Sequence, residues 1–265
     1  MNKVSFFSFV EEISKKAIFE AGQLAKDYKK KISVRYKSKN QPVTNADIAI
    51  DNFLKSFFKD QTPSIGWVSE ETKDNKSRFN SDLFWCLDPI DGTRSYINGK
   101  PEYTISLALI KRNKPIIGYI LNPETEEFFF AKENCGAFCN NKKILVNENQ
   151  NISSLKYGIS SSEIKKLEKY DFLENQNILR MGSIAYKIAL VAKGKIDVAI
   201  SFTKKNDWDL AASDLILKEA GGKINKISGE DIIYNSSHMT IDSVIASNIK
   251  VMKKLNTKFY KVENG

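Results

Sequence analysis

The sequence predicts a mixed α+β fold in two tightly joined halves, on three observations. Amphipathic helix patterns occupy most of the chain up to residue 57, and a block of short strand patterns joined by turn residues follows them. Beyond about residue 147, strand and helix patterns alternate. Neither an internal repeat nor a linker rich in proline, glycine and serine interrupts the chain. We therefore expect residues 1–145 and 146–265 to form two halves of one compact unit.

The first half should contain two helices and an antiparallel sheet. Apolar residues recur every three or four places in residues 5–30, which is typical of an amphipathic helix. Thr44 and Asp47 form a capping box before a second helix that continues to Phe57. Short apolar runs bounded by turn residues predict strands, the last three of them in an antiparallel meander. The expected strands are residues 32–36, 65–69, 83–87, 103–110, 116–121 and 127–131.

The second half should alternate strands with helices in an α/β pattern. Short apolar runs are followed by helical periodicity, and Gly221-Gly222 supplies a stop signal after one of these helices. The expected strands are residues 157–160, 178–181, 197–202 and 244–246, and the expected helices are residues 163–170, 184–192, 210–220 and a final helix after residue 246.

Composition predicts a cytoplasmic protein without a membrane span. The 265 residues are 42% hydrophobic, which is enough for a self-sufficient core. The apolar stretches are far shorter than the ~20 residues that cross a bilayer. The first residues lack the apolar region and cleavage site of a signal peptide.

The few cysteines and histidines exclude several enzyme classes. Three cysteines argue against a disulfide framework, and the spacing of Cys135 and Cys139 lacks the further ligands of a zinc site. A mechanism that needs a histidine would depend on His238. Ser-His-Asp hydrolysis, Cys-His proteolysis and histidine-ligated metals are therefore nearly excluded. The chemistry must come from carboxylates, hydroxyls, lysines or backbone groups.

The net charge of +9 has two interpretations. Nucleic-acid-binding proteins are often this basic, but they cluster the charge and interleave aromatic residues for stacking. Here the lysines are spread along the chain in short groups. Solvated lysine faces are therefore the favoured interpretation, and both remain compatible with an anionic substrate.

The most informative segment surrounds two aspartates at the end of the expected strand 83–87. Pro89 fixes the backbone between Asp88 and Asp91, so both carboxylates can turn toward one point. Gly92 allows a backbone N–H to approach a ligand, and Thr93 opens a helical turn that favours an anion. Carboxylates beside an anion-binding backbone require a cation between them. An ordinary turn is the alternative, since Asp-Pro and Asp-Gly are common turn pairs.

Other acids also lie at the ends of expected elements. Glu70 and Glu71 follow the strand 65–69, and Asp209 stands at the start of the helix 210–220. Taken singly, the glutamates could be a solvated edge, Asp209 a simple N-cap and Asp47 a capping-box residue. Their common position at the ends of elements makes them candidates for one site.

In this order, the segments resemble the inositol monophosphatase family, the lithium-sensitive, magnesium-dependent phosphatases. The resemblance implies alternating helix and sheet layers, αβαβα, with the site between the two halves, and a homodimer. It covers nearly the whole chain, and the matching stretches are VTNAD at 43–47, SEE at 69–71, LDPIDGT at 87–93, AKENCGAFCNNKKILV at 131–146, GS at 182–183 and WDLAASDLILKEAGG at 208–222.

The resemblance also implies roles for individual residues. Glu70, Asp88 and the Ile90 carbonyl would hold a first Mg²⁺. Asp88, Asp91 and Asp209 would hold a second, and Glu70 would share a third. An oxygen-only donor set independently selects a hard ion, Mg²⁺ or Mn²⁺, over Zn²⁺. The residues expected to act in catalysis are Asp47, Glu70 and Thr93, and those expected to contact substrate are Asp91, Gly92, Thr93, Gly182, Ser183 and Lys204.

The expected substrate is a small phosphate ester, with several esters left open. The resemblance favours a 3′(2′),5′-bisphosphate nucleotide such as 3′-phosphoadenosine 5′-phosphate, because Ser69 precedes the paired acids as in nucleotidases of the family and Phe202 stands in place of a glutamate that contacts inositol in others. The nearby Lys204 and Lys205 offer positive charge to a second phosphate. The segment 96–101 favours inositol 1-phosphate instead, and histidinol phosphate also stays open. An alternative of another class is a non-catalytic protein that binds nucleic acid or a sugar phosphate. The intact acidic set weighs against nucleic acid, because clustered carboxylates repel its backbone.

Overall fold

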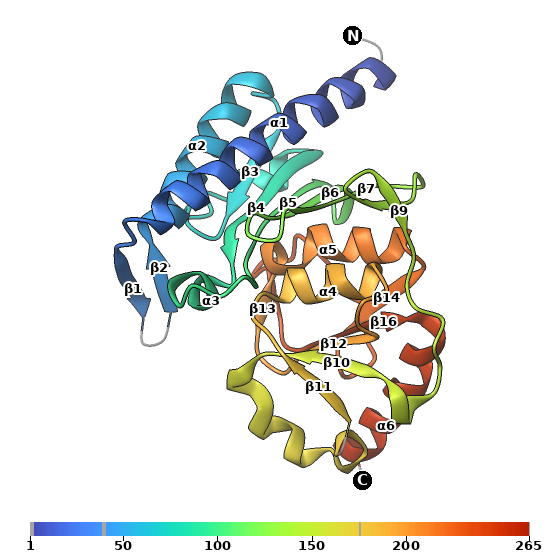
Figure 1. Cartoon of the computed structure of the whole chain (residues 1–265). Coiled ribbons are helices and arrows are strands. Elements are labelled where there is room, and N and C mark those ends of the chain that lie inside the picture. The colour runs from blue at the N-terminus through green and yellow to red at the C-terminus, as the bar shows by residue number, and fades with distance from the viewer. Residues whose placement is uncertain (1–2, 39–40, 175, 265) are drawn as a thin grey trace.

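Helices and sheets alternate in layers (Figure 1). The structure is a computed structural model that describes residues 3–38, 41–174 and 176–264. Helices α1 and α2 cover one face of the larger sheet, α4 and α5 lie between that sheet and a second one, and α6 covers the far face of the second sheet. This order confirms the αβαβα layers that the resemblance implies. The α-helices are α1 (Lys3–Lys29), α2 (Asn45–Gln61), α3 (Thr93–Ile97), α4 (Ile184–Ala192), α5 (Asp207–Glu219) and α6 (Ile249–Asn264).

The larger sheet contains the predicted meander. Its order among the described residues is β3-β4-β5-β6-β7-β8-β9, with β3 parallel to β4 and the other neighbours antiparallel. The sequence missed β8 and β9, because each is only three residues long and two exposed lysines occupy most of β9. The strands are β3 (Gly66–Ser69), β4 (Leu83–Asp91), β5 (Thr104–Lys111), β6 (Lys114–Asn122), β7 (Glu127–Lys132), β8 (Ala137–Cys139) and β9 (Lys142–Ile144).

The second sheet has the order β11-β10-β12-β16-β14 within the described chain. Strand β10 runs parallel to β11 and β12, whereas β16 runs antiparallel to β12 and β14. Small two-stranded sheets join β1 with β2 and β13 with β15. The strands are β1 (Val34–Ser38), β2 (Gln41–Thr44), β10 (Lys156–Ile159), β11 (Asn177–Arg180), β12 (Val198–Ser201), β13 (Lys205–Asn206), β14 (Gly222–Asn225), β15 (Thr240–Ile241) and β16 (Val244–Asn248).

One expected helix is a 3₁₀ helix instead. The segment predicted at residues 163–170 forms η3 (Ser161–Lys169). Its apolar Ile164 and Leu167 are three residues apart, which matches the three-residue turn of a 3₁₀ helix. The other 3₁₀ helices in the described part of the chain are η1 (Ser77–Asn80), η2 (Ile152–Ser154) and η4 (Asp171–Leu173).

Both faces of the larger sheet are buried, and alternate residues of its strands serve different layers. On β4, Trp85 and Leu87 pack with α1 and α2, whereas Phe84 and Cys86 pack with α4 and α5. Strand β5 is consequently buried from Thr104 to Ile110. A strand covered on both faces has a near-continuous apolar sequence, which is why β5 and β6 were predictable. The division of the chain near residue 145 stays a prediction.

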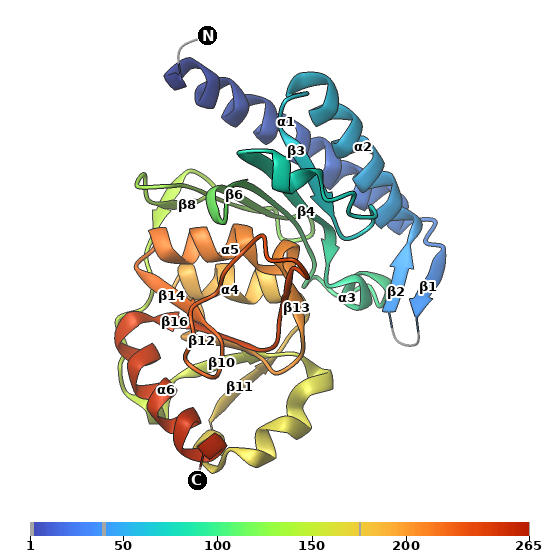
Figure 2. The ribbon, with the colours of Figure 1, turned by 180° about the vertical axis from the view of Figure 1, so that it is seen from behind.

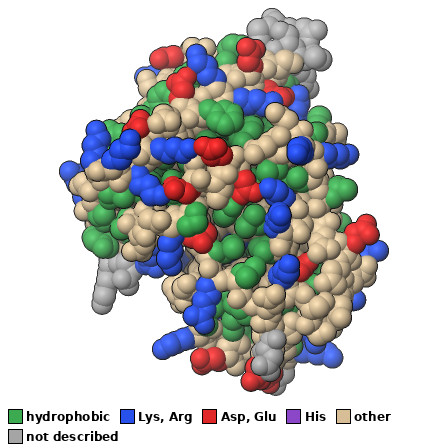
Figure 3. Space-filling model, viewed as in Figure 1, with side chains coloured by type: hydrophobic (Ala, Val, Ile, Leu, Met, Phe, Trp, Pro, Cys, Tyr) green, Lys and Arg blue, Asp and Glu red, His purple; other side chains and the backbone are tan. Residues whose placement is uncertain are grey.

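The charged surface on the side of Figure 1 is mixed. Lysine and arginine side chains occur in small groups among acidic and uncharged ones, rather than in one broad patch (Figure 3). This distribution agrees with the interpretation of solvated lysine faces. None of the helices in the described residues has the combination of length and hydrophobicity that a membrane crossing needs.

Candidate active site

The acidic site forms where β4 ends and α5 begins. The pairing of β4 with β5 is interrupted between Asp88 and Asp91 by a bulge, which bends the strand and changes the direction of its side chains. Asp209 lies in the first turn of α5. One carboxylate oxygen from each aspartate lies within 4.8 Å of the others, so the three form a group that could hold a metal ion.

Asp209 is not a simple N-cap. Asn206 occupies the N-cap position of α5, and Asp209 is the third helical residue of a capping box. The Asn206 backbone N–H donates to Asp209 Oδ2 at 2.6 Å. This bond occupies one oxygen and fixes the carboxylate, while its other oxygen remains available to a cation.

Burial and mutual repulsion keep this group from ionising fully without a cation. Burial raises the pKa of Asp88 well above its usual value, and the charges of Glu70, Asp91 and Asp209 raise it further. The pKa of Asp209 rises to about 7, from burial first and then from the charge of Asp91. The pKa of Asp91 is also raised by burial, although Ser183 Oγ and the Ala185 N–H donate to its Oδ2 at 2.6 and 2.7 Å. A hard divalent cation would remove the repulsion, so the donor set fits Mg²⁺ or Mn²⁺.

The turn after β4 places backbone N–H groups at the edge of the cleft. Gly92 is the N-cap of α3 with φ +95°, and a Cβ there would lie 2.8 Å from the Glu102 carbonyl oxygen. Only glycine fits this position without strain. Gly92 and Thr93 both line the cleft, where their N–H groups could meet a phosphate.

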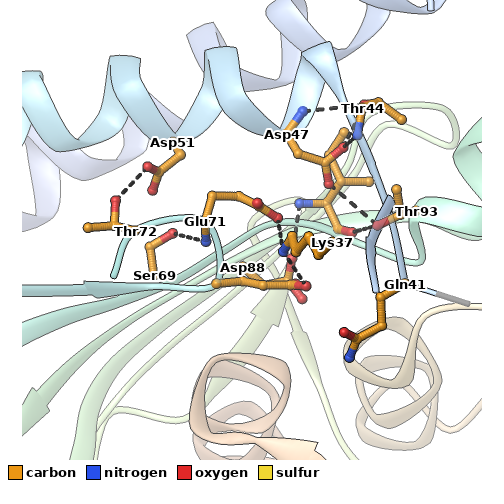
Figure 4. Close-up of polar contacts among 12 residues, drawn as sticks. Lys37, Gln41, Thr44, Asp47, Asp51, Ser69, Glu71, Thr72, Asp88 and Thr93 are labelled. Carbon is orange, nitrogen blue, oxygen red and sulfur yellow. Dashed lines mark hydrogen bonds and ion pairs between the residues drawn. The ribbon is translucent and has the colours of Figure 1, made fainter. Parts of the chain in front are cut away.

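Asp47 and Thr93 are in contact. Asp47 Oδ2 accepts hydrogen bonds from the backbone N–H and the hydroxyl of Thr44 at 2.7 and 2.5 Å, which confirms the predicted capping box. Thr93 Oγ1 lies 3.4 Å from Asp47 Oδ1 and 3.1 Å from the Ile90 carbonyl oxygen (Figure 4). Burial raises the pKa of Asp47 to about 6 despite the Thr44 bonds. The carboxylate can therefore accept or hold a proton close to neutral pH.

The paired glutamates share a lysine that sequence reasoning missed. Lys37 of β1 donates to Glu70 at 3.0 Å and to Glu71 at 2.6 Å, and the Lys37–Glu71 pair is drawn in Figure 4. Burial raises the pKa of Glu71 to about 7, although Lys37 opposes the shift. No motif in the sequence indicated this pairing, because it depends on the fold of the β1–β2 hairpin over the end of β3.

A cleft of about 620 Å³ brings most of the predicted residues together. Ser183 is the N-cap of α4, and a Cβ on Gly182 would lie 2.1 Å from Ser95 Oγ, so the chain approaches the cleft closely there. Asp47 reaches the cleft through Thr93. The predicted residues that line it are Glu70, Asp88, Ile90, Asp91, Gly92, Thr93, Gly182, Ser183 and Asp209.

Lys204 points elsewhere. Its side chain is 77% exposed and lies 4.0 Å from Asp242, whereas the neighbouring Lys205 lines the cleft. Sequence reasoning also missed Arg180 and Glu163, which line the same cleft. No spacing motif marks these residues, and a choice between adjacent lysines depends on which way the short strand β13 faces.

Comparisons with known proteins extend over almost the full sequence. Residues 8–263 match the model of the inositol monophosphatase family. The 3′(2′),5′-bisphosphate nucleotidase CysQ of Aggregatibacter actinomycetemcomitans is 30% identical over 220 residues, 78% of this chain and 80% of that protein. A fructose-1,6-bisphosphatase/inositol-1-monophosphatase of Aquifex aeolicus is 31% identical over 222 residues, 80% of this chain and 83% of that protein. A solved IMPase structure from Thermotoga maritima has a TM-score of 0.83 at 26% identity, with 95% of this chain and 97% of that chain covered.

Proposed function

The chain belongs to the inositol monophosphatase family and is a phosphatase of small phosphate esters, and from that premise we propose that it hydrolyses a phosphomonoester with Mg²⁺ as its cofactor. The convergence of Asp88, Asp91 and Asp209 within 4.8 Å carries this proposal. Two buried carboxylates and a half-buried one so close together are stable as anions only around a cation.

Two metal positions, with a third shared by Glu70, are proposed for the cleft. Glu70, Asp88 and the Ile90 carbonyl would bind the first, and Asp88, Asp91 and Asp209 would bind the second. Bound magnesium would supply a water of lowered pKa and positive charge for the phosphoryl oxygens. Mn²⁺ has the same preference for oxygen ligands and is the expected substitute.

The protein's own groups would orient the attacking water and the phosphate. Thr93 Oγ1 and Asp47 Oδ1 lie 3.4 Å apart and are placed to bind one water by hydrogen bonds. The Asp47 carboxylate can take up the proton of that water. The N–H groups of Gly92 and Thr93 would bind the phosphate. Ser183 orients Asp91 through its hydroxyl, which fixes this ligand before any metal arrives.

For the substrate, we propose a 3′(2′),5′-bisphosphate nucleotide such as 3′-phosphoadenosine 5′-phosphate. Lys205 and Arg180 line the cleft and offer positive charge to a second phosphate. The Phe202 ring stacks on Tyr170 at 5.2 Å and is not among the residues that line the cleft, so the Phe202 side chain itself offers a substrate hydroxyl no carboxylate, whereas Glu163 does line the cleft. The identity with CysQ of A. actinomycetemcomitans supports the proposal. Inositol 1-phosphate and histidinol phosphate are the alternative substrates.

A panel of phosphate esters tests the function. We expect Mg²⁺-dependent phosphate release from 3′-phosphoadenosine 5′-phosphate at least about tenfold faster than from inositol 1-phosphate, histidinol phosphate or fructose 1,6-bisphosphate. Each ester is assayed with Mg²⁺, with chelator and with added lithium, which should inhibit. A preference for another ester would replace the proposed substrate. If none of the four esters releases phosphate, the proposal that the protein hydrolyses one of them is wrong.

Two adjacent lysines provide a matched test of the second-phosphate contact. Lys205→Met should reduce the preference for the bisphosphate over inositol 1-phosphate by about tenfold, because one charge-assisted hydrogen bond is lost. Lys204→Met removes an exposed lysine outside the cleft and should leave that ratio unchanged. Ratios of kcat/KM for the two esters measure both effects. An equal loss with both esters would show that Lys205 serves their common phosphate instead.

The remaining expectations are further proposals. We expect a homodimer, because the family resemblance implies one. We expect a cytoplasmic location from the composition of the sequence. A non-catalytic protein that binds nucleic acid would instead show strong, steeply salt-dependent duplex binding with the metals chelated.

A further inference from the structure

Asp209 belongs to a different part of the fold from its partner acids. Asp88 and Asp91 end a central strand of the larger sheet, whereas Asp209 lies in the first turn of α5. The oxygen spacing within this group therefore depends on whatever fixes the start of α5 relative to the larger sheet. Ser106 Oγ of β5 gives one such contact, donating to the Trp208 carbonyl oxygen at 3.1 Å.

A second and larger contact centres on Asn235. This residue lies in the segment between β14 and β15, which Figure 2 shows as an orange loop reaching the start of α5 near β13. Its Nδ2 donates to the Arg112 carbonyl oxygen at 2.9 Å, and its Oδ1 accepts from Arg78 Nη1 at 2.5 Å. Its backbone N–H donates to Asp207 Oδ2 at 2.6 Å. One residue thus joins two positions on the larger-sheet side to the first residue of α5.

The groups that Asn235 joins are buried charges. Arg78 and Asp207 are almost fully buried, at 1% and 0% exposure. Arg78 Nε also donates to Asp74 at 2.9 Å, while Arg78 Nη2 and Asp207 Oδ1 have no hydrogen-bond partner among the described residues. A buried charged group that already lacks one hydrogen-bond partner is strongly destabilised when it loses another. The bonds that Asn235 makes to these groups are therefore costly to break. The arrangement is therefore held in one geometry.

The C-terminal end of the segment between β14 and β15 also contacts the start of α5. The Asp207 backbone N–H donates to the Met239 carbonyl oxygen at 3.1 Å, and β13 pairs with β15 directly before the helix. Asn235 has φ +61°, a conformation that asparagine tolerates better than most residues. The backbone at Asn235 is thereby shaped so that its N–H and its side chain reach different elements.

We propose that Asn235 is a positioning residue for the metal site: its bonds to Arg78, Arg112 and Asp207 set the distance of Asp209 from Asp88 and Asp91. The inference rests on the proposed function, because it assumes that these acids bind the metal. Asn235 is not among the residues that line the cleft, so we expect it to contact neither metal nor substrate. Loss of its side chain should weaken metal binding and leave the chemistry at saturating metal intact.

Asn235→Gly tests this directly, because glycine accepts φ +61° and removes both side-chain bonds. We expect Mg²⁺ to bind the metal-free protein about tenfold more weakly by isothermal titration calorimetry, the usual scale for loss of a group that orients a ligand. The value of kcat at saturating Mg²⁺ should stay within about threefold. Asn235→Asp keeps the acceptor for Arg78 and loses the donor for Arg112, so about threefold weaker binding is expected. If Asn235→Gly does not fold, the Mg²⁺ affinity of Asn235→Asp tests the inference in its place.

Ser236→Ala is the matched control. Ser236 Oγ accepts from the Met239 N–H at 3.0 Å, so this change weakens the same loop without touching Arg78 or Arg112. Its Mg²⁺ affinity should equal that of the wild type. Lower thermal stability of the Asn235 variants with wild-type Mg²⁺ affinity would show a merely structural role and overturn the inference. If the wild type itself binds no Mg²⁺, the proposed function is wrong and the inference is wrong with it.

Discussion

Asp88→Asn is expected to lower kcat by at least about 100-fold while the fold remains intact. Asp88 is proposed to touch both metals, and an amide cannot replace a shared anionic ligand. The change is nearly isosteric and replaces a carboxyl group whose ionisation is opposed by burial and by the charges of Glu70, Asp91 and Asp209. The metal-free variant should therefore unfold at a higher temperature than the metal-free wild type. Phosphate release at saturating substrate and Mg²⁺, with thermal unfolding in chelator, measures both effects.

Asp214→Asn is the control for Asp88→Asn. Asp214 also lies on α5 and is half-buried, but its carboxylate accepts from the Tyr234 hydroxyl at 2.8 Å outside the acidic cluster. An amide oxygen can keep that bond, so activity should stay within about threefold of the wild type. An Asp88→Asn protein with more than a tenth of normal activity would contradict the metal-site assignment.

Without metal, the protein should lose stability as the pH rises from about 4 through 7. The folded-state pKa values of Asp47 and Asp209 are raised to about 6 and about 7, mainly by burial. The folded protein therefore binds protons more tightly than the unfolded chain at these groups. The resulting stabilisation is fully present below the unfolded pKa values, near 4, and is lost as the pH passes the folded ones. One pKa unit corresponds to about 1.4 kcal/mol, so the rises from about 4 to about 6 for Asp47 and to about 7 for Asp209 correspond to losses on the order of 3 and 4 kcal/mol.

Urea unfolding at about pH 5, 6 and 7 in the presence of chelator measures this loss. Saturating Mg²⁺ should reverse it at pH 7, because the cation compensates the ionised carboxylates and binds only the folded protein. Asp209→Asn should make the loss of stability in chelator smaller, since an amide does not titrate and the contribution of Asp47 alone remains. A metal-free wild type whose stability stays constant or rises over this range would refute the electrostatic account.

The predictable elements were those with strong local signals. Helix α4 was predicted with its correct ends, because an apolar run between Ser183 and Gly194 leaves little choice of boundaries. The Thr44–Asp47 capping box has the same local character. Strands β13 and β15 were missed, because two residues each give no periodicity and their pairing is set by the loop between them. Strand β2 was missed because Pro42 lies within it.

The same distinction applies to the candidate site. The acids were found because they lie at the ends of expected elements, in motifs that together resemble those of the inositol monophosphatase family. The Lys37 pairing with Glu70 and Glu71 could not be found, because it depends on the placement of a hairpin. Asn235 was equally hidden, since its partner Arg78 is 157 positions away in the chain. Contacts of that range arise from tertiary packing and leave no local pattern.

The helical layer between the two sheets has a consequence for how this chain can diversify. Because α4 and α5 pack against both sheets, a fragment ending near residue 145 would expose an apolar face of β4–β7 to water. Such a fragment should aggregate rather than fold, so the halves cannot be exchanged between relatives as independent modules. New substrate preferences must instead arise by replacements around the rim of the cleft. The central layer thus makes loop variation, not recombination of halves, the accessible route to a changed specificity.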